Sequence, residues 1–281
     1  MVKAVETSLR ELLEGTKQYQ VPLYQRTYSW NKTQFERLWE DLVKLVDDRI
    51  DRGVDATHFI GSLVLAPTPG LGPAGLQEYL IVDGQQRLTT LTLLLAAIRD
   101  HRAITEDPSH RDRVDEKYLL NKWEQGQPTK LLPTQADRES YLACIGNTAQ
   151  AGDAGPIGAA YRFFRARLVE VDDPDDDLDI QRLEEAVISG LSLVCVTAQP
   201  GDNAHRIFES LNNTGLKLTQ GDLLRNYIFM RLPGQGERVY LAHWLPLQER
   251  LTADELEMLF WLDLVQSDAR AKQSNTYALQ Q

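Results

Sequence analysis

Two short apolar runs, set among longer segments of helical periodicity, constrain the fold of this chain more than any other feature. Residues 59–65 and 79–82 have the composition and length of buried strands, and the Pro/Gly-rich segment 67–75 predicts a loop between them. A third strand is predicted over residues 191–196, and helical patterns occupy most of the remaining chain. Because strands and helices do not alternate regularly, the sequence predicts an α+β fold, a small sheet core surrounded by many helices, rather than a doubly wound sheet.

Local signals predict several helix boundaries. Ser8 and Glu11 have the spacing of a capping box, and a further helix begins near Thr219. A helix from about Lys32 carries one apolar face at helical spacing, formed by Phe35, Leu38, Trp39, Leu42, Leu45 and Val46. The acidic run 172–179 contains a proline and predicts a solvated loop rather than a metal site.

Composition narrows the class of protein. The chain has 281 residues, 42% of them apolar and 25% charged, which is an ordinary globular balance. No apolar run approaches the roughly 20 residues that span a bilayer, and the N-terminus lacks a signal-peptide core, so we expect a cytoplasmic protein. Cys144 and Cys195 have neither the spacing nor the companions of a zinc site. A net charge of −11 argues against a general nucleic-acid coat but leaves room for a local basic patch.

The segment Asp83-Gly84-Gln85-Gln86-Arg87 joins a predicted strand to a predicted helix. A helix N-terminus binds phosphate, Gly84 permits close approach to the backbone, and Arg87 adds a fork of donors. Gln85 or Gln86 could then hold an attacking water. Alternatively, Asp83 as N-cap and Gln86 three residues later form a capping box without any ligand. That alternative does not explain a cation in the first turn, and local physics favours neither interpretation.

Residues 22–30 crowd three aromatic side chains and an arginine beside a proline. This composition suits a phosphate pocket with an apolar rim or a stacking surface for nucleic acid, although Tyr28 and Trp30 could simply pack under the next helix. We expect Trp30 in the core, and Tyr24, Gln25 and Arg26 exposed in a cleft.

A third polar segment spans residues 207–226. Asn-Asn-Thr-Gly between two helices is good C-cap chemistry, but Glu209, Asn212, Lys217, Asp222 and Arg225 gather around the same turn. A carboxylate from Glu209, Asp222 or Asp83 could hold Mg²⁺ beside a nucleoside triphosphate. The chain has no GxxxxGK[ST] loop, HExxH or GxSxG motif.

Four segments, in order, resemble one protein family. They are Pro-x-Tyr-Gln-Arg-x-Tyr-x-Trp at 22–30, Phe-Ile-Gly-Ser at 59–62, Asp-Gly-Gln-Gln-Arg-Leu-Thr-Thr-Leu at 83–91, and Ile-Phe-Glu-x-Leu-Asn-x-x-Gly ending in Asp-Leu-Leu-Arg-Asn at 207–226. Together they resemble the N-terminal domain of GmrSD-type type IV restriction enzymes, and most closely the SspE branch found in phosphorothioate-dependent defence. Each motif is weak alone, but four in family order are specific.

The resemblance implies a ParB/sulfiredoxin-like core that binds and hydrolyses nucleoside triphosphates. In the family, the residues matching Gln85, Gln86 and Arg87 serve the nucleotide, and those matching the Tyr-Gln-Arg segment lie at the same cleft. We therefore expect catalytic roles for Asp83 and these three residues. We expect nucleotide contacts from Gly84, Thr89, Arg26, Asn212, Lys217 and Arg225, with Mg²⁺ as cofactor.

In the SspE branch, this domain senses phosphorothioate DNA and controls a C-terminal His-Asn-His nuclease that nicks DNA. Sulfur is larger and less hydrated than oxygen, so an apolar rim of Pro22 and Tyr24 beside Arg26 would favour it, with Gln25 and Trp30 completing the sensing surface. A sensor of glucosylated hydroxymethylcytosine would instead need a pocket for a flipped base, which no segment clearly offers. The sequence ends before such a nuclease, so we expect no DNA cleavage by this chain itself.

We predict four parts: a core with the two motifs over 1–100, a helical insertion over 101–190, completion of the core over 191–232, and a helical linker over 233–281. Expected partners are modified DNA, a nucleoside triphosphate such as GTP, and the nuclease domain, with no membrane and a possible homo-oligomer. A module that reads DNA without hydrolysis and a purely structural scaffold are the alternatives.

Overall fold

Two units make up the chain in the computed structural model, which describes residues 3–23, 25–68, 76–122, 129–171, 178–198, 220–230, 232, 236–267 and 272. The first unit comprises residues 1–21 and 27–202, and the second comprises residues 22–26 and 203–281. The second unit therefore takes five residues from the middle of the first unit's sequence, and these five belong to the Pro-x-Tyr-Gln-Arg segment.

A mixed sheet organises the first unit, and its strands are β1 (Lys3–Ser8), β2 (Lys17–Gln20), β3 (His58–Pro67), β4 (Gln77–Asp83), β5 (Leu131–Leu132) and β6 (Leu191–Thr197). Their order among the described residues is β1-β6-β3-β4-β2-β5. The β1–β6 and β3–β4 pairs are antiparallel, and the other three pairs are parallel. The predicted α+β class is confirmed, as are the three predicted strands.

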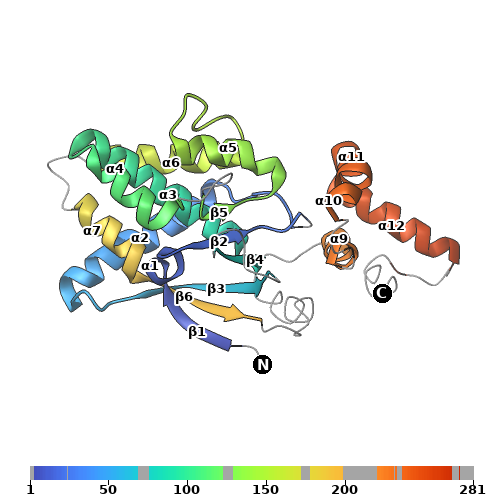
Figure 1. Cartoon of the computed structure of the whole chain (residues 1–281), viewed down its shortest axis with the longest axis horizontal. Coiled ribbons are helices and arrows are strands. Elements are labelled where there is room, and N and C mark those ends of the chain that lie inside the picture. The colour runs from blue at the N-terminus through green and yellow to red at the C-terminus, as the bar shows by residue number, and fades with distance from the viewer. Residues whose placement is uncertain are drawn as a thin grey trace. The chain divides into compact units, whose positions relative to one another are not determined.

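Helices of the first unit gather on one side of this sheet (Figure 1). They are α1 (Leu9–Leu13), α2 (Lys32–Arg52), α3 (Gln85–Thr105), α4 (Ser109–Val114), α5 (Gln135–Gly146), α6 (Pro156–Val171) and α7 (Ile180–Glu185). Two π-helical segments, Asp115–Leu119 and Ala186–Gly190, continue α4 and α7. None of the described helices is long and apolar enough to cross a membrane.

Two N-terminal helix predictions are confirmed. Ser8 caps α1 in a capping box with Glu11. Asn31 caps α2 in the same way with Gln34, and the six apolar side chains predicted to share one face are all buried. The acidic segment 172–177 lies outside the described residues, while Asp179 accepts a hydrogen bond from the Gln181 backbone N–H and caps α7.

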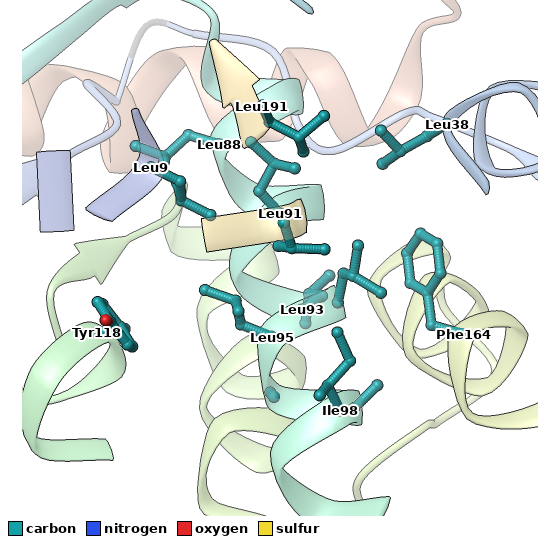
Figure 2. Close-up of a cluster of buried hydrophobic side chains, with 14 of the residues drawn as sticks. Leu9, Leu38, Leu88, Leu91, Leu93, Leu95, Ile98, Tyr118, Phe164 and Leu191 are labelled. Carbon is teal, nitrogen blue, oxygen red and sulfur yellow. The ribbon is translucent and has the colours of Figure 1, made fainter. Parts of the chain in front are cut away.

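Helix α3 is the central element of the core. It is buried around its whole circumference from Leu88 to His101, as expected of a helix that has protein on every side. Figure 2 shows its apolar side chains among those of α1, α2, α6 and β6, namely Leu88, Leu91, Leu93, Leu95 and Ile98 against Leu9, Leu38, Phe164 and Leu191. Each such leucine stabilises the fold by roughly 2 kcal/mol, and together they fix the position of the helix N-terminus.

The second unit contains α9 (Gln220–Met230), α10 (Gly236–Val239), the π-helical segment Tyr240–Trp244, α11 (Leu245–Arg250) and α12 (Ala253–Ser267). Aromatic rings form its core: Phe229 packs edge-on against Tyr240 and Trp244, and Trp244 stacks on Phe260. Leu23 packs against this cluster, which accounts for the assignment of residues 22–26 to the second unit.

Candidate functional site

Helix α3 begins at a glycine and has no side-chain cap at its N-terminus. Strand β4 ends at Asp83, and Gly84 follows as the N-cap with φ 92° and no side-chain capping hydrogen bond. A Cβ atom on Gly84 would lie 2.9 Å from the Ser62 backbone O and 3.0 Å from Leu63 Cδ1. Only glycine therefore satisfies both the left-handed backbone and the close approach of β3.

The capping box between Asp83 and Gln86 does not form. Gly84 takes the N-cap position, and the Gln86 side chain bonds to another segment of the chain. Its Nε2 donates to the Thr27 backbone O at 3.0 Å, and its Oε1 accepts from the Ser29 backbone N–H at 2.8 Å. The amide of Gln86 thus holds the segment that follows the Tyr-Gln-Arg motif.

Two further contacts fix the same segment. The Tyr28 hydroxyl lies 2.6 Å from Thr90 Oγ1 on α3, and the Tyr28 backbone N–H donates to Asp137 Oδ2 at 2.8 Å. Thr134 Oγ1 also donates to Asp137 Oδ2, at 2.5 Å. Burial raises the pKa of Tyr28 and that of Asp137, and the hydrogen bonds to Asp137 act in the opposite direction. We call Gln86, Thr90, Asp137 and the backbone of residues 27–29 the α3 clamp.

Arg87 lies in the first turn of α3 and points back across β3. Its Nη1 donates to the Ser62 backbone O, and a Cβ atom on Gly61 would meet Arg87 Nη2 at 2.8 Å. Gly61 has φ 115° and lies where the register of β3 against β6 shifts between Phe59 and Ser62. Burial lowers the pKa of Arg87, partly offset by the negative charge of Asp83.

The aromatic segment differs in part from its prediction. Tyr28 is fully buried, whereas Trp30, predicted in the core, is half-buried and packs against the core from its edge. Gln25, predicted to be exposed, is only 7% exposed, and Arg26 is half-buried. Tyr24 lies outside the described residues. The sequence placed these residues by hydropathy alone, which does not reveal that residues 22–26 pack with the second unit.

The second unit brings Arg26 and Arg225 within electrostatic range of each other. Arg225 is 5% exposed, and its Nη2 donates to Asp222 Oδ1 at 2.8 Å. Burial is the main cause that lowers the pKa of Arg225; the charge of Arg26 lowers it further, and that of Asp222 raises it. The other candidates from this segment, Glu209, Asn212 and Lys217, lie outside the described residues.

Metal ligands are sparse in what the structure describes. No group of three or more His, Cys, Asp or Glu side chains there could hold a metal ion. The carboxylate of Asp222 is engaged by Arg225. Asp83 is half-buried beside the α3 N-terminus.

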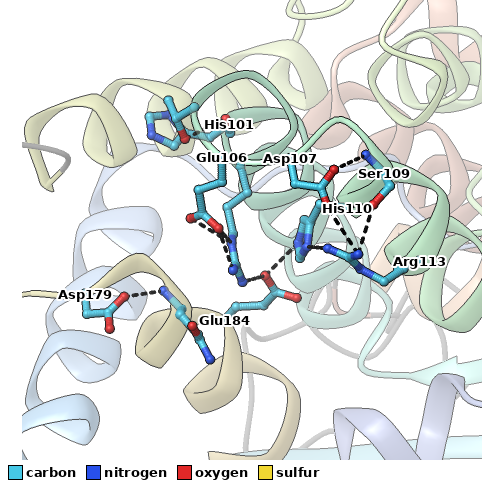
Figure 3. A network of polar contacts seen from close by, with 11 residues as sticks. His101, Glu106, Asp107, Ser109, His110, Arg113, Asp179 and Glu184 are labelled. Atoms are coloured by element: carbon cyan, nitrogen blue, oxygen red, sulfur yellow. Dashed lines mark hydrogen bonds and ion pairs between the residues drawn. The ribbon is translucent and has the colours of Figure 1, made fainter.

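A buried polar network, which sequence reasoning missed, joins the far half of α3 to α4 and α7 (Figure 3). Arg102 bonds to Glu184 at 2.6 Å and to Glu106 at 2.7 Å, and His110 Nε2 lies 2.9 Å from Glu184. Burial tends to raise the pKa of Glu184, but His110 and Arg102 outweigh it and lower that pKa. The sequence shows only charged residues at the end of a helical pattern. Nothing in it indicates that Arg102 pairs with Glu184, about 80 residues later in the chain.

Comparison with known proteins gives a family. The model described as "GmrSD restriction endonuclease, N-terminal domain" matches residues 9–229. The match covers strands β2 to β6, α3 and nearly all of α9, and so includes the four segments that carry the resemblance. No curated protein sequence matches the chain. On the strength of a match over most of its length, the chain belongs to the GmrSD restriction endonuclease N-terminal domain family.

Proposed function

We propose that this domain binds a nucleoside triphosphate at the N-terminus of α3, hydrolyses it with Mg²⁺, and couples hydrolysis to recognition of modified DNA. The observation that carries the proposal is a helix N-terminus that begins at glycine, has no side-chain cap and carries an arginine in its first turn. Within a restriction protein, such a sensor would control the nuclease that attacks the DNA.

Electrostatics at this helix end favour an anion. The helix dipole gives the N-terminus a partial positive charge that no side-chain cap offsets, and Arg87 adds a full one. Two like charges at one place are costly when Arg87 is desolvated, and a phosphate group would offset both. Gly84 and Gly61 supply the space for this arrangement, because a side chain at either position would collide with its neighbours.

The glutamines divide into two roles. Gln86 is committed to the α3 clamp through both ends of its amide, so its effect on a ligand would come through the position of residues 27–29. Gln85, in the same first turn, is our candidate for orienting the attacking water. Mg²⁺ would neutralise phosphate charge, and Asp83 is our candidate ligand for it.

For the DNA modification we propose phosphorothioate, sensed by Pro22, Tyr24, Gln25, Arg26 and Trp30. A softer and less hydrated sulfur suits a cation with an apolar surround. Glucosylated hydroxymethylcytosine is the competing modification, and duplexes carrying one or the other separate the two.

The decisive experiment measures phosphate release from GTP and ATP with Mg²⁺, with and without phosphorothioate duplex. Arg87→Ala should abolish turnover, and Arg87→Lys should lower it by at least tenfold, because lysine keeps the charge but loses the fork. Arg37→Ala, on the exposed face of α2, is the matched control and should leave turnover unchanged. Wild-type turnover equal to that of Arg87→Ala would refute the proposal.

Two glycine variants test separately whether Arg87 contacts the nucleotide. Gly61→Ala and Gly53→Ala both place alanine at a positive φ, but only the first collides with Arg87; Gly53 has nothing within 4 Å. Both should lose about 1–2 kcal/mol of unfolding free energy from backbone strain. Only Gly61→Ala should also weaken nucleotide binding, because it displaces the guanidinium. Equal binding by the two variants would mean that Arg87 does not contact the nucleotide.

The commitment of Gln86 to the backbone favours one alternative, a module that reads DNA without hydrolysis. In that case modified DNA would bind, Arg26→Ala would weaken it, and nucleotide would change nothing. Isothermal titration with DNA, in the presence and absence of a non-hydrolysable nucleotide, distinguishes this module from the nucleotidase.

A further inference from the structure

A cavity lies on the first unit between the start of α2 and the start of α6. Its volume is about 590 Å³, within the size range of small-molecule sites, and its walls include Trp30, Phe35 and Phe163 with Lys32 and Arg162. We call it the aromatic pocket. It is large enough for one planar ring system with an attached phosphate.

The aromatic rings that line this pocket pack against the buried core. Phe35 and Phe164 are fully buried, and the half-buried Phe163 packs against both, with ring centroids 5.6 Å and 5.3 Å away respectively. Trp30 rests against the same core. Aromatic faces that are fixed in this way are ready to stack on a flat ligand without losing side-chain entropy.

Positively charged side chains lie around the pocket, although the whole chain has a net charge of −11. Lys32, 78% exposed, and Arg162 line the pocket, and Arg167 has its Cζ 5.5 Å from the centroid of the Phe163 ring. We call these three the rim cations. Acids are present too: Glu36 lies 3.5 Å from Lys32, and Glu170 lies 2.8 Å from Arg167. Cations beside exposed rings are the usual chemistry for holding unstacked bases and their phosphates.

The pocket also touches the α3 clamp. Ser29 and Trp30 line it, and the Ser29 backbone N–H is the group that donates to Gln86 Oε1. One hydrogen bond therefore separates the pocket wall from the Asp83–Arg87 segment.

We propose that the aromatic pocket binds one unstacked nucleobase of DNA, with the ring against Phe163 and Trp30 and the neighbouring phosphate on Lys32. Ring stacking supplies binding that a paired base inside a duplex cannot give, because its faces are covered. This site is additional to the proposed nucleotide site and does not depend on hydrolysis.

The test uses fluorescence anisotropy with the full 281-residue chain and no nucleoside triphosphate. Two labelled duplexes differ only at one position, which is either an unpaired thymine or an abasic analogue. The thymine duplex should bind at least tenfold more tightly, in line with about 1–3 kcal/mol for stacking one base. Equal affinity for the two duplexes would overturn the proposal.

Matched variants locate the effect. Phe163→Leu should remove the preference for thymine, while Phe59→Leu, at an exposed phenylalanine on β3, should keep it. Lys32→Gln should weaken both duplexes a few-fold, and Lys44→Gln, exposed on the same helix, should not. Lys32→Gln is a surface change, so it remains informative if Phe163→Leu does not fold.

A competition arm separates DNA from free nucleotide. Thymidine monophosphate at millimolar concentration should displace the thymine duplex poorly, because it lacks the flanking phosphates. Efficient displacement would assign the pocket to a free nucleotide and overturn the DNA proposal. Because no triphosphate is present, the outcome stands whether or not phosphate release is observed.

Discussion

Lys130 is a residue whose pKa is changed by its surroundings in the folded protein. It is 2% exposed, and its Nζ donates to the backbone O atoms of Leu13 at 2.6 Å and Gly15 at 2.7 Å. Burial, reinforced by the nearby charge of Lys17, lowers its pKa to about 8. A lysine after a threonine in a polar stretch gave no signal of this burial, because the carbonyls that hold it are more than 100 residues away.

This pKa predicts a specific dependence of stability on pH. Between pH 8 and 10.5, Lys130 is neutral when folded and protonated when unfolded, so unfolding takes up a proton. The unfolding free energy should therefore rise with pH in this window, by up to about 1.4 kcal/mol per pH unit from this residue. Urea unfolding from pH 8 to 9.5 should show a smaller slope in Lys130→Met than in wild type. Parallel profiles would contradict the assignment.

At the level of elements, the sequence predicted the strands and helices that carry a strong pattern. The strands β3, β4 and β6, and α2 with its buried face, follow directly from local periodicity. Strands β1 and β2 and the two-residue β5 were not predicted. The side chains of β1 are mostly exposed, and β5 is defined only by its pairing with Tyr19 and Gln20 of β2.

At the candidate site, too, the sequence predicted the local motif but not the contacts with distant residues. The Asp83–Arg87 segment was identified from its motif, but local physics left a capping box equally plausible. The deciding contacts join Gln86 to Thr27 and Ser29, more than 50 residues away in the chain. No local pattern encodes them.

The α3 clamp yields a prediction at this scale. Gln86→Leu keeps the volume of the side chain but leaves the Thr27 O and Ser29 N–H without their partner. Hydrogen exchange at Ser29 and Tyr28 should accelerate at least tenfold, and the unfolding free energy should fall by about 1–3 kcal/mol. Gln85→Leu, one residue earlier, is the control and should leave exchange at Ser29 unchanged. Slow exchange at Ser29 in Gln86→Leu would show that the clamp does not hold this segment.

At the scale of the whole molecule, a net charge of −11 opposes binding to DNA, which is also negatively charged. Most of the surface repels the phosphate backbone, so binding must come from a confined area with few cations. The rim cations, Lys32, Arg162 and Arg167, form such an area.

The salt dependence of DNA affinity reports how many phosphate contacts that area makes. The logarithm of the association constant should fall with the logarithm of salt concentration with a slope of about −2 to −4, against about −10 for a protein with extensive phosphate contacts. Titrations from 50 to 200 mM salt give this slope, and Lys32→Gln should reduce its magnitude by about one. A slope of wild-type size in Lys32→Gln would place the phosphate contacts elsewhere.

The membership of residues 22–26 in the second unit has a practical consequence for dissecting the protein. A contiguous fragment that begins after residue 202 lacks Leu23, which packs on the aromatic cluster around Trp244. A fragment that ends at residue 202 displays that leucine with nothing to cover it. Deletion mapping would therefore damage both pieces at once and mistake a packing defect for the loss of a binding determinant. Circular permutation, or mixing complementary fragments, is the route by which each unit's own contribution can be assigned.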